Sequence, residues 1–468
     1  MTVKCESESS GKCQQEQLRL PAFGKRHVQG FLMFLCLMVE QGGRGTINVA
    51  IVSMTNQNET NPNIPTYDWD NSNIVLSSFT WGYLVLQVLA GQVGGSHGYK
   101  WLAFTAMAVN SLACLLIPLA AAYLGSYGVM GCRVVQGLAQ GFFFPIAYLM
   151  LSKWAPEEER SRMMTFVYSG ILVAGIITGP VTGYICASSV GWPVGFYVFG
   201  SVGLLWCLLW LFMGYDSPAV HPTISPQERK YIEESLGHHE AAEVVPTPWK
   251  AIFTSIHFWA IVVASIGTSY GATFLSTEMN QYLVKAMKFN VESSGVATAM
   301  PAVAAIVTTP FYGFISDLIN KKKWLSRLNS RRLFQLYACY PQTIILIWMA
   351  FLTKSQGILA AALPVLSFSA LGGIVFGLNV NILDLSSRFS GVTQGFANTL
   401  GSAFGLVAPL VVQYTVPHMD DPEEWRLPFL ICAAAYGVSA TFFAIFASGN
   451  KQWWDSGPIK ITSDTEKV

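Results

Sequence analysis

Three charged side chains stand inside long apolar stretches, where insertion of a charge costs about 2.5–3.5 kcal/mol and requires a partner, a cavity or a function. Glu40 and Arg44 are four residues apart, so on a helix they share a face with the acid before the base. Arg133 has no acidic residue near it, because none occurs between positions 101 and 151. If Glu40 neutralises Arg44, one positive charge stays unpaired, and a cavity with that field attracts an anion. The spacing therefore predicts an anion site, with a static Glu40–Arg44 pair and an interfacial Arg133 as the purely structural alternatives.

The composition indicates the environment in which these charges must work. Of the 468 residues, 52% are hydrophobic and 12% are charged, whereas soluble domains have about 25% charged residues. The net charge of +1 gives no general attraction to nucleic acid. No nucleophile and base pair, phosphate loop or metal-ligand spacing stands out, so we expect neither an enzyme nor a bound metal or cofactor. The chain is predicted to be an all-α membrane protein in contact with lipid.

Twelve apolar stretches are long enough to cross about 30 Å of hydrocarbon, and they form two sets of six. The first set lies near 28–54, 74–96, 101–121, 126–151, 163–187 and 194–214. The second set lies near 255–284, 293–317, 333–353, 357–383, 391–414 and 426–447. The predicted parts are an N-terminal tail (1–27), a six-helix half (28–214), a polar linker (215–252), a second half (253–447) and a C-terminal tail (448–468). Within the linker, Ser225 and Glu228 have the spacing of a capping box.

The distribution of Lys and Arg predicts the orientation, because cytoplasmic segments are enriched in them. With both termini and the linker in the cytoplasm, the inner segments hold 22 of these residues and the outer loops hold four. The sequon at Asn58 falls in the predicted outer loop 55–73, which has no Lys or Arg, so Asn58 is a predicted glycosylation site. We therefore expect both termini, the linker and the tails to be cytoplasmic.

Two six-span halves joined by a polar linker is the layout of the major facilitator fold, in which the substrate site lies between the halves near the membrane midplane. The segment from Gly313 to Asp317, followed by Lys321–Lys323, is similar to the inner-loop motif of that superfamily. The corresponding segment after the second span, Gly91–Lys100, has no acid and no arginine. The motif is therefore expected to act in the second half, with a degraded copy in the first.

Longer runs of sequence resemble one family of anion transporters. These runs include RGTINVAIV from Arg44, SSFTWGY from Ser77, RVVQG from Arg133, SKWAPEEERSR from Ser152 and FAIFASG from Phe443. They resemble solute carrier family 17, which includes the lysosomal sialic-acid exporter, the vesicular glutamate transporters and the type I sodium/phosphate cotransporters. The resemblance runs from about Phe23 to Trp454. It implies that Arg44 and Arg133 face the central cavity and bind the anion.

Departures from the family pattern narrow the substrate and the coupling ion. Where glutamate-type members carry a further arginine and a histidine, this chain has Thr268 and Leu76, which favours phosphate or a monoanionic organic acid over a dicarboxylate. Where proton-driven members carry a glutamate and a nearby histidine, it has Gln140 and Tyr148, and a glutamine does not titrate.

Two ions, a proton and sodium, are candidates for the coupling cation. Glu40 is a candidate carboxylate for a proton. Sodium is the other candidate driver, and the side chains considered as its oxygen ligands are Asn379, Asn381, Thr399 and Ser402. The same polar groups commonly serve helix packing in membranes.

The resemblance and these residues together predict a symporter that moves inorganic phosphate or a small organic anion by alternating access, driven by sodium. It is expected as a monomer in the plasma membrane or in a lysosomal or vesicular membrane. One alternative is a proton-coupled lysosomal or vesicular exporter of a sialate-like or glutamate-like anion that uses Glu40. An alternative of another class is a membrane sensor that binds a ligand without transporting it.

Overall fold

The computed structural model describes residues 23–55, 64–69, 71–236, 246–288 and 291–455. Every regular element within these ranges is a helix. The elements of the first half are α1 (Lys25–Met54), α2 (Ser72–His97), α3 (Lys100–Gln140), α4 (Phe143–Trp154), α5 (Arg160–Ala187) and α6 (Trp192–Met213). We call this set the N-terminal bundle.

Helix α3 contains two spans rather than one. Its backbone leaves the helical conformation at Gly125, where φ is 64°, a value that an L side chain rarely adopts. A hydrogen bond of 2.9 Å joins Gln140 to Asn110, and these residues lie 15 positions on either side of Gly125. The two parts of α3 therefore run side by side in opposite directions, as the predicted stretches 101–121 and 126–151 require. The second part continues after a short turn at Gly141 into α4, an interruption that the apolar pattern did not reveal.

The second half forms the C-terminal bundle. Its longer helices are α9 (Ile256–Thr277), α11 (Val291–Lys322), α12 (Arg327–Met349), α13 (Gly357–Leu371), α15 (Ser390–Gly405) and α17 (Arg426–Phe446). Its shorter elements are α10 (Met279–Gln281), η2 (Tyr282–Ala286), η3 (Lys354–Gln356), η4 (Val375–Asn379), α14 (Val380–Leu385), α16 (Val407–Thr415) and η5 (Trp453–Asp455). A π-helical turn at η4 joins α13 to α14 within the predicted stretch 357–383. The linker contributes η1 (Pro218–Val220), α7 (Pro226–Leu236) and α8 (Trp249–Thr254).

Nine helical stretches among the described residues are long and apolar enough to cross a membrane. One of them runs for 55 residues from Lys100 to Trp154 and contains the break at Gly125. Helices α1 and α12, of 30 and 23 residues, are not among the nine. The prediction of twelve spans with both termini inside is not tested by this count and stays a prediction.

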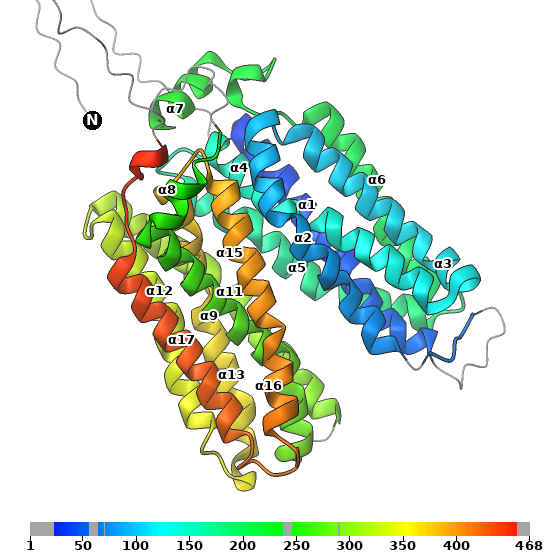
Figure 1. The fold of residues 1–468 in the computed structure, drawn as a ribbon. Helices are drawn as coiled ribbons and strands as arrows, with labels where there is room; N and C mark the ends of the chain where they lie inside the picture. The colour runs from blue at the N-terminus through cyan, green and yellow to red at the C-terminus, as the bar shows by residue number, and fades with distance from the viewer. Residues whose placement is uncertain (1–22, 56–63, 70, 237–245, 289–290, 456–468) are drawn as a thin grey trace, which may run out of the picture.

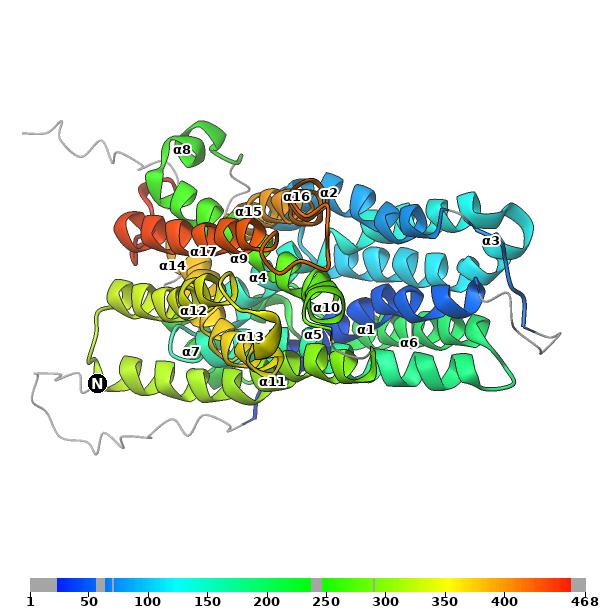
Figure 2. The ribbon, with the colours of Figure 1, turned by 90° about the horizontal axis from the view of Figure 1, so that it is seen from below.

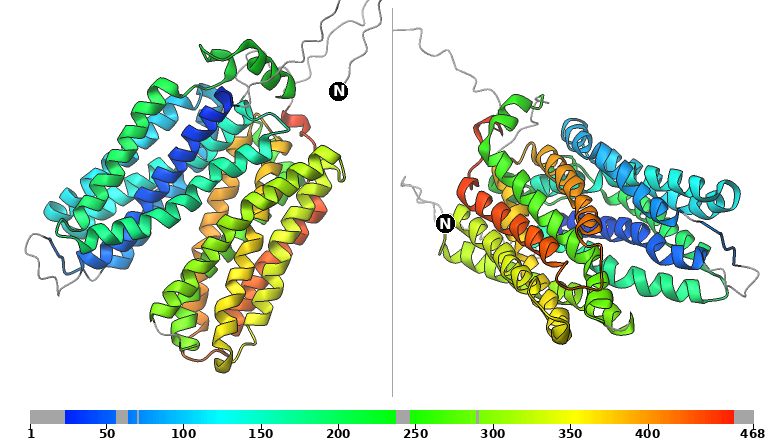
Figure 3. Two further views of the ribbon diagram at one scale, coloured as in Figure 1. Left: turned by 180° about the vertical axis from the view of Figure 1, so that it is seen from behind. Right: turned by 60° about the horizontal axis from the view of Figure 1, so that its bottom comes forward.

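The two bundles lie side by side and separate toward one end. They meet where the linker helices α7 and α8 lie, and they diverge at the opposite end, as Figure 1 and the left view of Figure 3 show. Viewed from below, α2 lies beside α15, and α5 lies beside α11 (Figure 2). We call the end with α7 and α8 the linker end, and the other the far end.

Glycines allow the closest approach between the bundles. A side chain on Gly91 of α2 would collide with the backbone of Gly391 on α15, and one on Gly395 would collide with the backbone of Gln87. Residues 87 and 91, like 391 and 395, are one helical turn apart, so α2 and α15 touch over two successive turns. This seam fixes the relative position of the bundles near the linker end.

The capping box predicted in the linker forms only in part. The Ser225 hydroxyl accepts a hydrogen bond from the backbone N–H of Glu228 at 3.1 Å, as such a box requires. The Glu228 carboxylate, however, accepts from the backbone N–H groups of Lys25 and Arg26 at 2.9 and 3.1 Å. Glu228 therefore caps the N-terminus of α1. Its carboxylate accepts two hydrogen bonds from free backbone N–H groups there, where the helix dipole also favours a negative charge.

Candidate functional site

Two arginine guanidinium groups lie against one aromatic ring inside the N-terminal bundle. The Arg44 guanidinium carbon on α1 is 4.5 Å from the centre of the Phe79 ring on α2, and that of Arg133 on α3 is 4.8 Å from it. Arg44 also lies 5.4 Å from the Tyr83 ring. Gly137 brings α3 against the backbone of α2 at Phe79, which places the ring between the arginines. The structure thus brings together the two residues that the sequence predicted as substrate-binding.

No ion pair within 4.0 Å among the described residues includes either of these arginines. Arg133 is 3% exposed. Its Nη1 donates to Gln136 Oε1 at 3.2 Å and to the backbone oxygen of Arg44 at 3.5 Å. Its Nε has no hydrogen-bond partner. Arg44 is half-buried. Contact with aromatic faces compensates a buried cation only in part. The site therefore holds two positive charges that an anion can neutralise.

Glu40 does not neutralise Arg44 in the described structure. No ion pair within 4.0 Å joins these two residues, although they share a face of α1. Glu40 is 2% exposed, and its Oε1 has no hydrogen-bond partner. The direct ion pair of the structural alternative is therefore not formed, although the charge of Arg44 acts on the Glu40 carboxylate from a longer distance.

The other predicted coupling residues of this bundle are buried. The Gln140 amide nitrogen donates to the backbone oxygen of Glu40 at 3.0 Å and to Asn110 Oδ1 at 2.9 Å, so Gln140 connects α1 to both parts of α3. Tyr148 on α4 lies edge-on to Tyr168 on α5, with ring centres 6.0 Å apart. Gln140 thus lies beside Glu40.

Two of the side chains proposed as sodium ligands in the C-terminal bundle make hydrogen bonds to the backbone. Asn381 on α14 donates through its amide nitrogen to the backbone oxygen of Ser448 at 2.8 Å, beyond the end of α17, while its Oδ1 is buried without a partner. Thr399 donates to a carbonyl group of its own helix. Asn379 closes the π-helical turn η4 and is half-buried, and Ser402 on α15 is also half-buried. None of these contacts brings the side chains around a common point, and their role in coupling stays a prediction.

A hydrogen-bonded group connects the arginine site to the C-terminal bundle. The Asn398 amide nitrogen on α15 donates to the Tyr83 hydroxyl at 2.9 Å and to Gln87 Oε1 at 2.7 Å. It lies one turn beyond Gly395, so it extends the seam toward the far end. Because the Tyr83 ring also faces Arg44, the seam reaches the arginine site directly. Sequence reasoning missed Asn398, since an asparagine in an apolar span has many roles.

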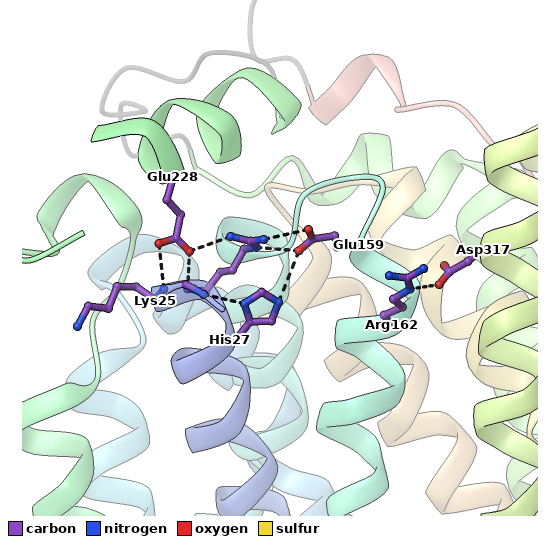
Figure 4. Close-up of polar contacts among 8 residues, drawn as sticks. Lys25, His27, Glu159, Arg162, Glu228 and Asp317 are labelled. Atoms are coloured by element: carbon purple, nitrogen blue, oxygen red, sulfur yellow. Dashed lines mark hydrogen bonds and ion pairs between the residues drawn. The ribbon is translucent and has the colours of Figure 1, made fainter. Parts of the chain in front are cut away.

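Charges at the linker end, by contrast, are paired across the bundles. Asp317 on α11 pairs with Arg162 on α5 (Figure 4). A side chain on Gly313, one turn earlier, would lie in van der Waals contact with Phe376 and Thr165. The two predicted motif residues thus lie where the bundles meet. Glu157, just before α5, pairs with Arg327 of α12 at 2.5 Å.

A buried triad at the same end was not predicted. Asp384 accepts from Arg160 of α5 at 3.3 Å and from Arg331 of α12 at 2.7 Å, so one carboxylate joins two arginines from different bundles. All three side chains are buried. The available signal was Asp384 itself, an acid within an apolar stretch.

The linker is held by a further cluster beside α1. Arg26 pairs with Glu159 at 2.7 Å and with Glu228 at 3.1 Å, and His27 lies 3.9 Å from Glu159 (Figure 4). Partial burial, followed by the charge of Arg26, lowers the pKa of His27 below its usual 6.5. The cluster joins three parts of the chain, which are α1, α7 and the segment that precedes α5. The predicted glycosylation site Asn58 lies outside the described residues.

Comparisons with known proteins agree with this architecture. A family model described as Major Facilitator Superfamily matches residues 33–409. A protein of Drosophila melanogaster named "Putative inorganic phosphate cotransporter" is 32% identical, with 94% of this chain and 88% of that protein covered. "Vesicular glutamate transporter 3" of Danio rerio is 32% identical, with 92% and 74% covered. The solved structure of the transporter FucP in the outward conformation is similar with a TM-score of 0.64, at 13% identity, over 90% of this chain and 99% of that one.

The fold, together with the two arginines that form no ion pair among the described residues, is that of a multi-pass membrane transporter built from two helical bundles. The chain belongs to the major facilitator superfamily and, within it, to solute carrier family 17. The fold class and the family expected from the sequence are therefore confirmed.

Proposed function

We propose that this protein is a secondary active transporter that binds an inorganic or small organic anion between Arg44 and Arg133. The observation that carries the proposal is that two guanidinium groups share the Phe79 ring without a carboxylate partner among the described residues. A guanidinium group offers a rigid fork of N–H donors that matches phosphate and carboxylate oxygens. An anion that replaces the aromatic face gains two charge-assisted contacts at once.

Inorganic phosphate or a small monoanionic organic acid is the substrate class that this site fits best. The names of the relatives refer to phosphate and to glutamate. At the positions where glutamate-type members are expected to carry further cations, this chain has Thr268 and Leu76. The Thr268 hydroxyl is bonded to the backbone oxygens of Ala264 and Ser265 on its own helix, so it adds no positive charge. Two cations suit an anion with one charged group better than a dicarboxylate.

In alternating access, contacts between the bundles break at one end of the molecule and form at the other. In the described structure the ion pairs Arg162–Asp317, Arg160–Asp384 and Arg327–Glu157 hold the bundles together at the linker end. The bundles diverge at the far end (Figure 1). With the linker in the cytoplasm, this is an outward-facing state. Opening to the cytoplasm must break these ion pairs.

A cation gradient is the proposed source of energy, with sodium as the first candidate and a proton on Glu40 as the second. Glu40 is favoured as the coupling group because it is a buried carboxyl without an ion pair, which costs free energy until a cation or a proton neutralises it. Of the side chains proposed for sodium in the C-terminal bundle, Asn381 and Thr399 donate hydrogen bonds to backbone oxygens. The proposed location is the plasma membrane or a lysosomal or vesicular membrane.

Uptake into proteoliposomes tests the proposed function. Purified protein is supplied with labelled phosphate, glutamate, sialate or urate under an imposed sodium gradient and then under a proton gradient. We expect sodium-driven phosphate uptake that Arg133→Gln abolishes at unchanged protein abundance. Proton-driven movement of an organic anion supports the second candidate. Anion binding without accumulation under either gradient supports a sensor instead of a transporter.

A further inference from the structure

Three buried polar residues meet where α1 packs against the two parts of α3. They are Glu40 of α1, Asn110 of the first part of α3 and Gln140 of the second, each no more than 2% exposed. Gln140 contacts the other two residues directly: its amide nitrogen donates to the Glu40 backbone oxygen at 3.0 Å and to Asn110 Oδ1 at 2.9 Å. The group is therefore one contact network, drawn from α1 and from the two antiparallel parts of α3.

Two oxygens of the network are buried without a hydrogen-bond partner, and the Asn110 amide nitrogen donates outside the network to Met107 Sδ at 3.9 Å. Both hydrogens of the Gln140 amide are used, and its Oε1 is buried without a partner. Glu40 Oε1 is also buried without a partner. Asn110 Oδ1 accepts one hydrogen bond and has a second lone pair. A buried acceptor that meets no donor needs a water, a proton or a cation to compensate it.

The side chain of Glu40 belongs to the face of α1 that covers this network. Gly43 is three residues after Glu40 and so lies on the same face of the helix. A Cβ atom on Gly43 would be 4.0 Å from Asn110 Nδ2, so this face packs directly on Asn110. Apart from the backbone of its own helix and its two chain neighbours, no other atom lies within 4 Å of that Cβ position, so glycine at 43 leaves open space on this face.

We propose that Glu40, Asn110 and Gln140 form a binding site for one sodium ion. Carboxylate and amide oxygens are the ligands that hard cations prefer in proteins. A cation can satisfy all three oxygens together. A proton, which resides on Glu40 alone, satisfies fewer of them, because the amides of Asn110 and Gln140 do not titrate. The position that corresponds to a titrating glutamate in proton-driven relatives thus supplies a neutral oxygen ligand here.

Sodium at this site has a direct consequence for the anion. Arg44 is four residues from Glu40, and its charge acts on the Glu40 carboxylate. A sodium ion on Glu40 cancels the negative charge that opposes an incoming anion, so the anion binds more tightly to Arg44 and Arg133. Coupling between two sites is reciprocal, so the anion must tighten sodium to the same extent. This role rests on the proposed function, whereas the sodium site itself does not.

Thermal unfolding of the purified full-length protein tests the site without any transport. The melting temperature is measured in detergent against NaCl concentration, with choline chloride added so that ionic strength stays constant and no phosphate is present. A ligand that binds only the folded state raises the melting temperature. We expect sodium to stabilise the wild-type protein, and potassium to have a smaller effect at the same concentration.

Glu40→Gln keeps the shape of the side chain and removes its charge, and we expect it to raise the half-maximal sodium concentration at least tenfold. Asn110→Leu removes one oxygen at similar volume and provides a second variant if the first does not fold. Glu278→Gln is the matched control, because Glu278 is also a buried carboxyl, at the far end of α9 in the other bundle. We expect it to retain the sodium response.

The outcomes separate this site from the proposed function. Equal stabilisation by sodium and choline, or a sodium response that Glu40→Gln and Asn110→Leu leave unchanged, overturns the sodium site. A response to acid that replaces the response to sodium and is lost in Glu40→Gln also overturns it, in favour of a proton on Glu40. A sodium response in a protein that accumulates no anion keeps the site and removes the transporter.

Discussion

Two groups of buried charges in this molecule use the same residue types in opposite ways. At the linker end, Asp384 forms ion pairs with both Arg160 and Arg331. In the middle of the N-terminal bundle, Arg44 and Arg133 share an aromatic ring and have no carboxylate within 4.0 Å among the described residues. The comparison teaches that burial of an arginine does not reveal its role, whereas the presence or absence of its counter-charge does. Paired charges hold the bundles together, and unpaired charges are available to a ligand.

The largest effect is expected at the paired group. Asp384→Asn leaves Arg160 and Arg331 buried without a negative partner, and breaking a buried pair costs about 3–5 kcal/mol. We expect much less folded protein and a clearly lower melting temperature in detergent. Gel filtration with fluorescence detection measures both.

The contrast with the unpaired group sharpens this test. Arg133→Gln removes a buried charge that has no counter-ion, so we expect its melting temperature to be equal to that of the wild type or higher. If Asp384→Asn is as stable as the wild-type protein, or if Arg133→Gln unfolds as readily as the triad variant should, the distinction between the two groups is wrong.

The sequence predicted the all-helical fold, the family and the pair Arg44 and Arg133, because long apolar stretches and isolated charges within them are local signals. It did not predict the triad around Asp384 or the bond from Asn398 to Tyr83. The contacts of Asp384 with Arg160 and of Asn398 with Tyr83 join residues more than 200 positions apart, and their geometry depends on how the bundles pack. Glu40 and Arg44 had the spacing of a helical ion pair, but the structure places no ion pair within 4.0 Å between them.

Loss of uptake is the next effect in size. Arg133→Gln is expected to lower initial anion uptake in proteoliposomes by at least about 100-fold, which corresponds to about 2.7 kcal/mol. Arg426→Gln is the matched control, since Arg426 is half-exposed at the far end and pairs with Glu423. Uptake by Arg133→Gln at the rate of the control variant would show that the unpaired charge is not needed.

A smaller effect is expected where the seam meets the arginine site. Tyr83→Phe removes only the hydroxyl that accepts from Asn398 and keeps the ring beside Arg44. Loss of this hydrogen bond should cost about 0.5–1.5 kcal/mol in the free energy of unfolding or in anion affinity.

A double-mutant cycle tests whether Asn398 acts through its hydrogen bond to Tyr83. Asn398→Ala should change anion affinity in the same direction as Tyr83→Phe, and the double variant should lose less than the sum of the two. Tyr340→Phe, which removes an exposed hydroxyl bonded to Thr441, serves as the control. Strict additivity would mean that Asn398 does not act through Tyr83.

The smallest effect concerns an exposed pair at the far end. Hydrogen bonding to Glu424, together with its charge, raises the pKa of His418 above the usual 6.5. The protonated histidine therefore adds stability below about pH 6.5, and this contribution disappears as the pH rises through the raised pKa. Titration of labelled histidines by NMR should give a midpoint above 6.5 for His418, and Glu424→Gln should lower it. An unchanged midpoint in this variant would assign the shift to another cause.

Anion binding to the purified protein tests the central claim most directly. The melting temperature is measured against phosphate concentration at constant sodium and ionic strength, for the wild type, Arg44→Gln, Arg133→Gln and the paired-arginine control Arg162→Gln. We predict that phosphate stabilises the wild type and Arg162→Gln, and that its effect is lost in both Arg44→Gln and Arg133→Gln. A phosphate response that survives in the folded Arg44→Gln and Arg133→Gln variants would contradict the assignment of the unpaired arginines as the anion site.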